Sequence, residues 1–391
     1  MYLPDDVKFI LNTLTENGFP AYAVGGCVRD SLMGRAAKDH DIATAARPEV
    51  ICRIFPRTVL TGEKYGTVTI LAEQPIEVTT FRIDGDYYDG RRPEEVRFTD
   101  RIEEDLSRRD LTINAIAYNE ESGYVDPFGG REDIASGLLR AVGEPRKRFQ
   151  EDALRILRVF RFSAELGFSI EARTLEACFQ LIEALSKVST ERILIEIYKA
   201  LDGAHADKLL PLFRNGGLSH LGFQRPQADF SLEALPKNRC CRLAALLYTC
   251  GGGRNILTRL RADNQTKRLT GAMLDQLAEP LPETPSDVKR RFSRIPPEIF
   301  SDFLRTYGAL HRVSVDESLA TTNRSIEEGE PWNLSMLNIG GRELVEMGVP
   351  EGKPVGAALN FLLRCVIENP ERNRRETLQR MVREYGDKIF E

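Results

Sequence analysis

The sequence has few sulfur or imidazole groups in positions that could form a site. It contains four histidines and seven cysteines, and the cysteines are Cys27, Cys52, Cys178, Cys240, Cys241, Cys250 and Cys365. No two cysteines have the spacing of a zinc knuckle, and their odd number does not fit a disulfide framework. We therefore expect reduced cysteines with structural roles.

Long hydrophobic runs are also absent. No apolar stretch approaches the roughly 20 residues that a membrane helix needs, and Asp5 and Asp6 stand where a signal peptide carries basic residues. The 391 residues, 42% of them hydrophobic and 29% charged, are enough for two to four domains with buried cores. These features predict a soluble, cytoplasmic protein with no membrane partner.

The chain has no overall excess of positive charge, since its formal net charge is −5. Binding of nucleic acid through bulk charge is therefore not expected. The arginines are unevenly distributed, however, and from Arg140 to Arg161 seven basic residues face only three acidic ones. A local cluster of this kind is typical of a phosphate-binding surface.

The hydrophobic pattern changes along the chain. The first 138 residues mix strand-like and helix-like segments, whereas the remainder is helical in pattern. We predict an α+β fold, with a mixed sheet and helices in residues 1–138 and helical domains at 139–202, 203–290 and 291–391. Strands are predicted at 21–24, 39–43, 67–71 and 76–80, and helices near 150–166, 171–185 and 190–202. The first helix is predicted to bury one face, made of Val7, Ile10, Leu11 and Leu14.

A strand ending in two glycines leads into the segment Val24-Gly25-Gly26-Cys27-Val28-Arg29-Asp30. Glycines at a strand-to-helix turn let backbone amides approach an anion at the helix N-terminus, and Arg29 can bind the same phosphate. On its own, such a turn is more often a plain structural connection. Together with the acidic residues that follow it, the segment predicts a triphosphate site.

Asp39 and Asp41 are separated by one residue in a predicted strand, which places both carboxylates on one face. Neighbouring carboxylates repel each other unless cations lie between them, and hard oxygen ligands suit Mg²⁺. Two such ions can activate an attacking hydroxyl and stabilise a leaving oxyanion. Glu77, on the strand face opposite Val78, is either a third carboxylate ligand or an exposed strand residue.

Two further motifs follow these segments: Arg108-Arg109-Asp110-Leu111-Thr112-Ile113-Asn114-Ala115 and Glu151-Asp152-Ala153-Leu154-Arg155-Ile156-Leu157-Arg158. In this order the motifs resemble those of the bacterial class II tRNA nucleotidyltransferases, the CCA-adding enzymes, and of their poly(A) polymerase relatives. The resemblance covers about the first 200 residues and continues more weakly toward the C-terminus. It implies a nucleotidyltransferase (polymerase-beta-like) head, followed by helical neck, body and tail domains that grip the tRNA acceptor end.

The resemblance also implies an activity and roles for single residues. The activity is template-independent addition of CCA to tRNA from CTP and ATP, with release of pyrophosphate by a two-metal mechanism. Asp39 and Asp41 are implied as catalytic Mg²⁺ ligands. Contacts to the nucleotide phosphates and sugar are implied for Gly26, Arg29, Arg109, Asp110 and Asn114. Asp110 and Asn114 lie four residues apart, so on a helix they would face one side.

Asp152 and Arg155 lie three residues apart in a predicted helix, where they would present an acceptor beside a donor. Cytosine and adenine offer an exocyclic amine next to an unprotonated ring nitrogen, whereas guanine and uracil offer a carbonyl beside a ring N–H. An Asp/Arg edge therefore accepts C and A, because a wrong base leaves buried polar groups unpaired at about 1–3 kcal/mol each. Arg158 and Arg161 continue this face toward phosphates or RNA, and an intrahelical salt bridge is an alternative role for Arg161.

Two segments favour a CCA-adding member of this family. Thr61-Gly62-Glu63-Lys64-Tyr65-Gly66-Thr67-Val68 resembles CCA-adding enzymes more than poly(A) polymerases, and the loop at 84–93 keeps a length that CC-adding members usually lack. The Gly and Asp content of this loop fits a mobile element that reshapes the pocket. An A-adding enzyme would retain the loop too, so A-adding, CC-adding and poly(A) activities stay as alternatives.

Other classes of function fit less well. A non-catalytic RNA-binding protein would not need both candidate metal ligands. The dipeptide His40-Asp41 suggests a metal-dependent phosphohydrolase, but His205, His220 and His311 are scattered without ligand spacing. Basic clusters at 289–291 and 372–375 are candidate tRNA contacts. The sequence leaves open whether the protein is a monomer or a homodimer.

Overall fold

The computed structural model describes residues 1–37, 39–62, 65–85 and 96–390. It consists of two compact units, one formed by Met1–Pro226 with Arg259–Arg261 and the other by Gln227–Thr258 with Ala262–Glu391. The first unit contains the segments predicted as head and neck, and the predicted division into four domains stays a prediction. None of the described helices is both long and apolar enough to cross a bilayer.

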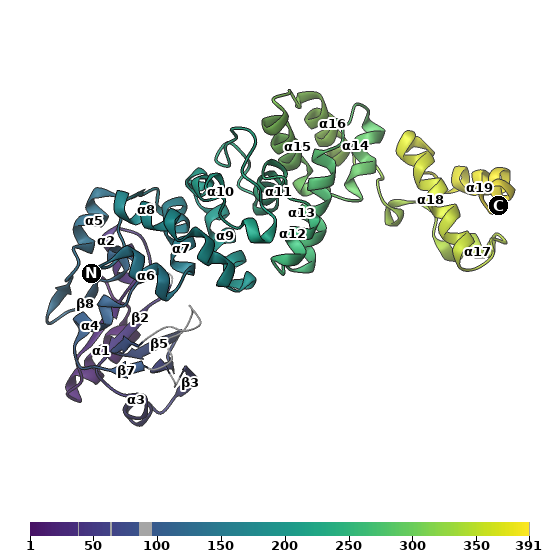
Figure 1. Cartoon of the computed structure of the whole chain (residues 1–391). Helices are drawn as coiled ribbons and strands as arrows, with labels where there is room; N and C mark the ends of the chain where they lie inside the picture. The colour runs from purple at the N-terminus through teal and green to yellow at the C-terminus, as the bar shows by residue number, and fades with distance from the viewer. Residues whose placement is uncertain (38, 63–64, 86–95, 391) are drawn as a thin grey trace. The chain divides into compact units, whose positions relative to one another are not determined.

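A mixed sheet of seven strands, in the order β3-β4-β5-β2-β1-β8-β9, forms the base of the first unit (Figure 1). Its strands are β1 Ala21–Val24, β2 Asp41–Thr44, β3 Thr58–Gly62, β4 Thr67–Leu71, β5 Pro75–Thr80, β8 Ala117–Asn119 and β9 Gly123–Val125. β2 and β5 run parallel, and the other neighbours are antiparallel. Two small ladders pair β6 Arg82–Asp84 with β7 Val96–Phe98, and β10 Leu138–Leu139 with β11 Ser169–Ile170.

The first unit also contains α-helices, both between the strands and after them in the sequence. They are α1 Asp5–Glu16, α2 Gly26–Leu32, α3 Pro48–Ile54, α4 Ile102–Ser107, α5 Gly130–Ser136, α6 Pro145–Glu151, α7 Leu154–Leu166, α8 Ala172–Gln180, α9 Thr190–Asp202 and α10 Leu210–Arg214. Short 3₁₀ segments occur at Thr112–Asn114, Ile182–Lys187, Ala206–Leu209 and Ser219–Leu221. The predicted order of a mixed sheet followed by helices is confirmed.

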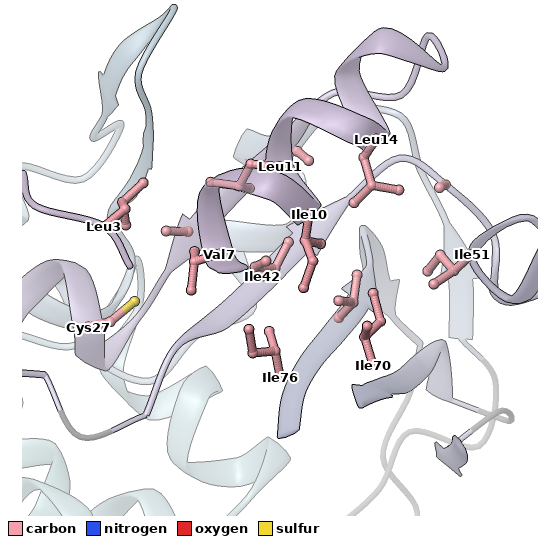
Figure 2. Packing of buried hydrophobic residues seen from close by; sticks show 14 of the residues in the cluster. Leu3, Val7, Ile10, Leu11, Leu14, Cys27, Ile42, Ile51, Ile70 and Ile76 are labelled. Carbon is pink, nitrogen blue, oxygen red and sulfur yellow. The ribbon is translucent and has the colours of Figure 1, made fainter. Parts of the chain in front are cut away.

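The predicted buried face of the first helix is confirmed. Figure 2 shows Val7, Ile10 and Leu14 of α1 pointing toward the isoleucines of the sheet, among them Ile42 and Ile76. All of them are buried in one hydrophobic cluster. This packing holds α1 against the strands in the middle of the sheet, which include β2 with Asp41.

The strand predictions are accurate in the centre and less so at the ends. β1 and β4 have the predicted bounds, while β5 begins one residue earlier at Pro75. β2 begins at Asp41 and not at the predicted residue 39, because its ladder with β1 ends where Asp41 pairs with Val24. Asp39 therefore precedes the strand, and the expectation that strand geometry aligns it with Asp41 is wrong.

The helix predicted near 150–166 is also wrong as a single element. α6 ends at Glu151, Asp152 adopts an extended conformation with φ −143° and ψ 105°, and α7 begins at Leu154. The Asp152 carboxylate accepts a hydrogen bond from the Leu154 amide at 3.0 Å, so its side chain competes with the continuing helix for this amide. The break turns the Asp152 side chain away from the face expected for an unbroken helix.

The second unit is helical. Its helices are α11 Arg239–Thr249, α12 Arg254–Arg259, α13 Asn264–Leu277, α14 Pro285–Phe292, α15 Pro297–His311, α16 Asp316–Glu327, α17 Gly341–Glu346, α18 Lys353–Glu368 and α19 Arg375–Phe390, with 3₁₀ turns at Leu334–Met336 and Pro370–Arg372. Lys289, part of a predicted tRNA-contacting cluster, is 2% exposed, with its ammonium 3.3 Å from the Glu330 carboxylate. Its place in that cluster is therefore wrong, because α14 turns Lys289 into the interior.

Candidate active site

A pocket of about 530 Å³ lies in the first unit. It is lined by Gly25, Gly26, Arg29, Asp41, Arg108, Arg109, Asp110, Asn114, Asp152, Leu154, Arg155, Arg158, Arg161, Phe162, Arg192 and Lys199. Eight of these residues are basic and three are acidic, which suits a polyanionic ligand. Of the predicted site residues, Asp39 is outside this lining, and so is Glu77, the possible third carboxylate.

The glycine turn brings the backbone of the first motif close to the second. Gly25 has φ 77° and ψ −127°, a conformation that favours glycine, and α2 begins at Gly26. A Cβ atom on Gly25 would lie 3.0 Å from Nη1 of Arg109. A side chain at residue 25 would therefore crowd the Arg109 guanidinium, which would have to shift by a few tenths of an ångström.

Substituting Gly25→Ala is expected to reduce nucleotide incorporation at least tenfold. The positive φ costs about 1–3 kcal/mol of stability, and the new methyl group crowds the Arg109 guanidinium and shifts it within the pocket wall. Gly34→Ala is the matched control, because Gly34 also has a positive φ of 68° but a methyl group there would have nothing within 4 Å. Full activity of Gly25→Ala in a primer-extension assay would contradict this expectation.

The candidate metal ligands lie on the neighbouring strands β2 and β5 and just before β2. Asp41 opens onto the pocket, and its register partner across the parallel ladder is Glu77. Desolvation by burial raises the pKa of Asp41, Arg109 opposes this shift, and the charge of Asp39 adds to it. Burial and the charges of Asp41 and Asp39 likewise raise the pKa of Glu77. The three carboxylates therefore form one mutually repelling group.

This group has the donor chemistry that Mg²⁺ prefers. Among the residues that the structure describes, no cluster of three or more Asp, Glu, His or Cys side chains is arranged as a complete metal site. Mg²⁺ does not require such a cage, because it is commonly bound by one or two carboxylates with water and substrate phosphates. The carboxylates of Asp39 and Asp41 therefore fit Mg²⁺.

Asp105 of α4 holds two arginines of the pocket. Its side chain accepts hydrogen bonds from Nε and Nη2 of Arg108 at 3.0 and 2.8 Å, and from Nη2 of Arg109 at 3.2 Å. Burial alone would raise the pKa of Asp105, but the two guanidinium groups outweigh it and lower the pKa. The carboxylate therefore stays ionised and fixes both cations.

Asp110 and Asn114 meet without lying on one helix. The chain is extended at Leu111, which bridges to Ala141, and only Thr112–Asn114 forms a 3₁₀ turn. The expected helical placement is thus wrong, yet Nδ2 of Asn114 donates to Oδ1 of Asp110 at 3.1 Å. Asn114 Oδ1 accepts from Arg29 Nη1 at 2.7 Å. The pair therefore connects the glycine turn to the second motif.

Asp110 also binds the helix that carries the last motif. Nε of Arg158 donates to Oδ2 of Asp110 at 2.7 Å. Burial opposes ionisation of Asp110, but Arg158 and the hydrogen bond from Asn114 hold its pKa far below the ordinary value. Asp110 and Arg158 therefore form a charged pair that ties α7 to the head.

Asp152 and Arg155 line the same pocket, and each is held by a different partner. Arg192 of α9 donates to both carboxylate oxygens of Asp152, at 3.3 and 2.6 Å. Nη1 of Arg155 donates to Glu151 at 2.7 Å, and Nη2 donates to the Arg108 carbonyl at 2.8 Å. Because the helix breaks at Asp152, these two side chains approach from separate elements and not from one helical face.

Arg161 forms the intrahelical salt bridge considered for it, and its contact with phosphates or RNA stays a prediction. Its Nε donates to Oε2 of Glu196 at 2.9 Å, and its Nη1 forms an intrahelical pair with Glu165 at 2.7 Å. It also lines the pocket. Glu196 is buried on α9, so this helix supports the wall formed by α7.

Six lining residues were not predicted as site residues: Gly25, Arg108 and Leu154 within the motifs, and Phe162, Arg192 and Lys199 beyond them. The resemblance does imply that the helix carrying Arg192 and Glu196 supports the base pocket. Arg192 and Lys199 share a face of α9 with Glu196 because they lie four residues before it and three after it. Phe162 directly follows Arg161 but carries no polar group that would mark it. Lys199 is exposed, and among the described residues no ion-pair partner is found for it.

Comparison with known proteins reveals the family of this chain. The sequence profile described as "Poly A polymerase head domain" matches residues 21–140, and that described as "Probable RNA and SrmB- binding site of polymerase A" matches residues 167–229. The CCA-adding enzyme of Geobacillus stearothermophilus is 36% identical over 394 residues, covering 94% of this chain and 94% of that protein. This chain belongs to the CCA-adding enzyme family.

Other members of the family agree with this assignment. The CCA-adding enzyme of Leuconostoc mesenteroides is 35% identical over 399 residues, covering 97% of this chain and 96% of the relative. The crystal structure of the Bacillus stearothermophilus CCA-adding enzyme in complex with CTP matches with a TM-score of 0.82 and 33% identity over 99% of both chains. The chain is thus a nucleotidyltransferase with the predicted α+β fold.

Proposed function

We propose that this CCA-adding enzyme family member completes the 3′ end of tRNA by adding C, C and A from CTP and ATP. The main support for the proposal is the pocket, because residues of all four sequence motifs line it, for example Gly26, Asp41, Arg109 and Arg155. Relatives that cover nearly the whole chain are named CCA-adding enzymes, and one of similar fold was crystallised with CTP. The proposed partners are tRNA, CTP and ATP, and the cytoplasm is the proposed location of the protein.

Asp39 and Asp41 are the proposed Mg²⁺ ligands, and Glu77 is the proposed third carboxylate because it pairs in register with Asp41. When bound, the metal supplies activation of the RNA 3′-hydroxyl and charge neutralisation at the leaving pyrophosphate. The carboxylates would hold the metal on the side of the pocket where β2 begins. Their neighbour Arg109 donates a hydrogen bond to Asp105 and lines the pocket, where it is a proposed phosphate ligand.

The arginines of the pocket are the proposed phosphate and sugar ligands. Arg29 is oriented by its hydrogen bond to Asn114, and Arg158 by its hydrogen bond to Asp110. Both guanidinium groups line the pocket and have further N–H donors for a phosphate. Guanidinium groups bind phosphate oxygens in pairs, which orients a triphosphate for in-line attack at its α-phosphorus. Lys199 of α9 also lines the pocket and is proposed to bind a further phosphate.

Asp152 and Arg155 are the proposed base-reading pair. A carboxylate has about four acceptor positions, and the Leu154 amide and Arg192 take three of those on Asp152. One position remains for the exocyclic amine of cytosine or adenine. Arg155 has five N–H donors. Three of them form hydrogen bonds within the protein, and the other two remain for the unprotonated ring nitrogen of the base.

The loop at 84–93 bears on which nucleotides are added. Its length favours complete CCA addition, but most of it lies outside the described residues. A-adding and CC-adding activities are therefore the alternatives to separate by experiment.

The decisive experiment offers three tRNAs, ending before C74, after C74 and after C75, with CTP or ATP singly or together. We expect CTP to extend the first two and ATP to extend only the third by one residue. Growth beyond the CCA end with ATP alone would indicate a poly(A) polymerase. A product that stops after two cytidines, or one formed only on the third tRNA, would identify a CC-adding or an A-adding enzyme.

A further inference from the structure

One aromatic ring lies among three arginines of the pocket. The centre of the Phe162 ring is 3.4 Å from the guanidinium carbon of Arg161, 5.1 Å from that of Arg29 and 5.3 Å from that of Arg158. Phe162 is 3% exposed, although it forms part of the pocket wall. The ring therefore touches arginines of both α2 in the head and α7.

These three arginines belong to one network of polar side-chain contacts. The network extends from Asp30 through Arg29, Asn114 and Asp110 to Arg158. It continues from Arg158 to Glu196, whose Oε1 lies 3.9 Å away, and from Glu196 to Arg161. Each arginine thus has an anionic or amide partner at one side and the Phe162 ring at another.

We infer that Phe162 is a positioning residue for the transferase reaction: its ring sets the three guanidinium groups that face the nucleotide. This inference rests on the proposed function, since it takes these arginines as nucleotide ligands. Like charges repel, and the carboxylates of Asp30, Asp110, Glu165 and Glu196 offset the charge of the three close guanidiniums through ion pairs. The negative face of a buried aromatic ring attracts cations without taking up their hydrogen-bond donors. The arginines therefore stay ordered with donors free for phosphate.

A plain core role predicts something different for Phe162. A residue that only fills space would affect stability when it is replaced, but not the affinity for nucleotide. Phe160 provides this comparison, because it is fully buried on the same helix and pairs with Phe179 at 6.1 Å. Among the described contacts no arginine lies over its ring.

The test compares Phe162→Met, Phe160→Met and Phe162→Tyr in the full chain. Methionine keeps an apolar side chain of similar size but removes the aromatic face. We expect Phe162→Met to raise the KM for CTP and ATP, and the dissociation constant for CTP without tRNA, about tenfold, with kcat changed less than threefold. Phe160→Met is expected to lower the melting temperature to a similar degree with KM unchanged. Phe162→Tyr keeps the ring and should keep the wild-type KM.

Several results would overturn the inference. An unchanged KM in Phe162→Met would assign the ring to packing alone, and equal increases in KM for both methionine variants would point to general loosening of α7. A Phe162→Tyr variant as weak in CTP binding as Phe162→Met would show that the aromatic face is not what matters. Failure of the proposed function is seen separately, as wild-type protein that binds CTP but does not extend tRNA.

Discussion

Asp41→Asn is expected to reduce nucleotide incorporation by at least about a thousandfold while leaving the protein folded. The amide keeps the shape of the side chain but loses the charge that binds Mg²⁺, which removes several kcal/mol of charge stabilisation from the transition state. Because the folded state raises the pKa of Asp41, its ionised form is disfavoured by folding at neutral pH. The melting temperature of Asp41→Asn should therefore equal or slightly exceed that of the wild type.

This combination separates a lost ligand from a damaged fold. Asp39→Asn should show the same loss of incorporation, whereas Glu73→Gln, an exposed residue between β4 and β5, should leave the rate unchanged. Glu77→Gln should reduce the rate at least tenfold if it completes the carboxylate group. Retention of more than a tenth of wild-type incorporation in Asp41→Asn would contradict the metal assignment.

Most residues that line the pocket could be named from the sequence through the family resemblance, which rests on the glycine turn, the acidic pair and the two arginine-containing motifs in their order. The structure brings Gly26, Asp41 and Asp110 into one pocket, and their roles stay predictions. Their convergence depends on strand order, which brings β2 between β5 and β1. Sequence periodicity indicates that strands exist, but it does not give this order.

The geometry within the motifs is harder to predict. Helical spacing suggests that Asp152 and Arg155 share one face, whereas the helix breaks at Asp152. At the break the Leu154 amide donates a hydrogen bond to the Asp152 carboxylate, which competes with helix propagation and which a periodic pattern does not reveal. The strand start at Asp41 follows from pairing with another segment, Val24, which is equally invisible to local patterns.

The partners of the functional residues are the least predictable. Arg192 and Glu196 come from α9, about 40 residues after the motif that they support. Only the packing of α9 against α7 reveals that they bind Asp152 and Arg161. The same holds for Phe162, whose contacts with three arginines depend on how α2 and α7 are placed within the first unit.

Replacing the base-reading residues is expected to change which nucleotide is added more than how fast it is added. In Asp152→Ala the acceptor for the exocyclic amine is lost, and a pyrimidine carbonyl no longer faces a carboxylate. The preference for CTP over UTP should fall by about 5- to 150-fold, the range that 1–3 kcal/mol per unpaired polar group provides. Competition between CTP and UTP on a tRNA ending before C74 measures this ratio directly.

Two controls separate base reading from support of the pocket. Glu165→Gln removes a partner of Arg161 outside the pocket lining and should preserve the CTP preference. Arg192→Gln keeps the Asp152 carboxylate but releases its bidentate partner, so the preference should weaken less than in Asp152→Ala. If Asp152→Ala still rejects UTP as the wild type does, base choice cannot depend on this carboxylate. Selection would then have to come from pocket shape, and the remaining roles of Asp152 would be to start α7 and to hold Arg192.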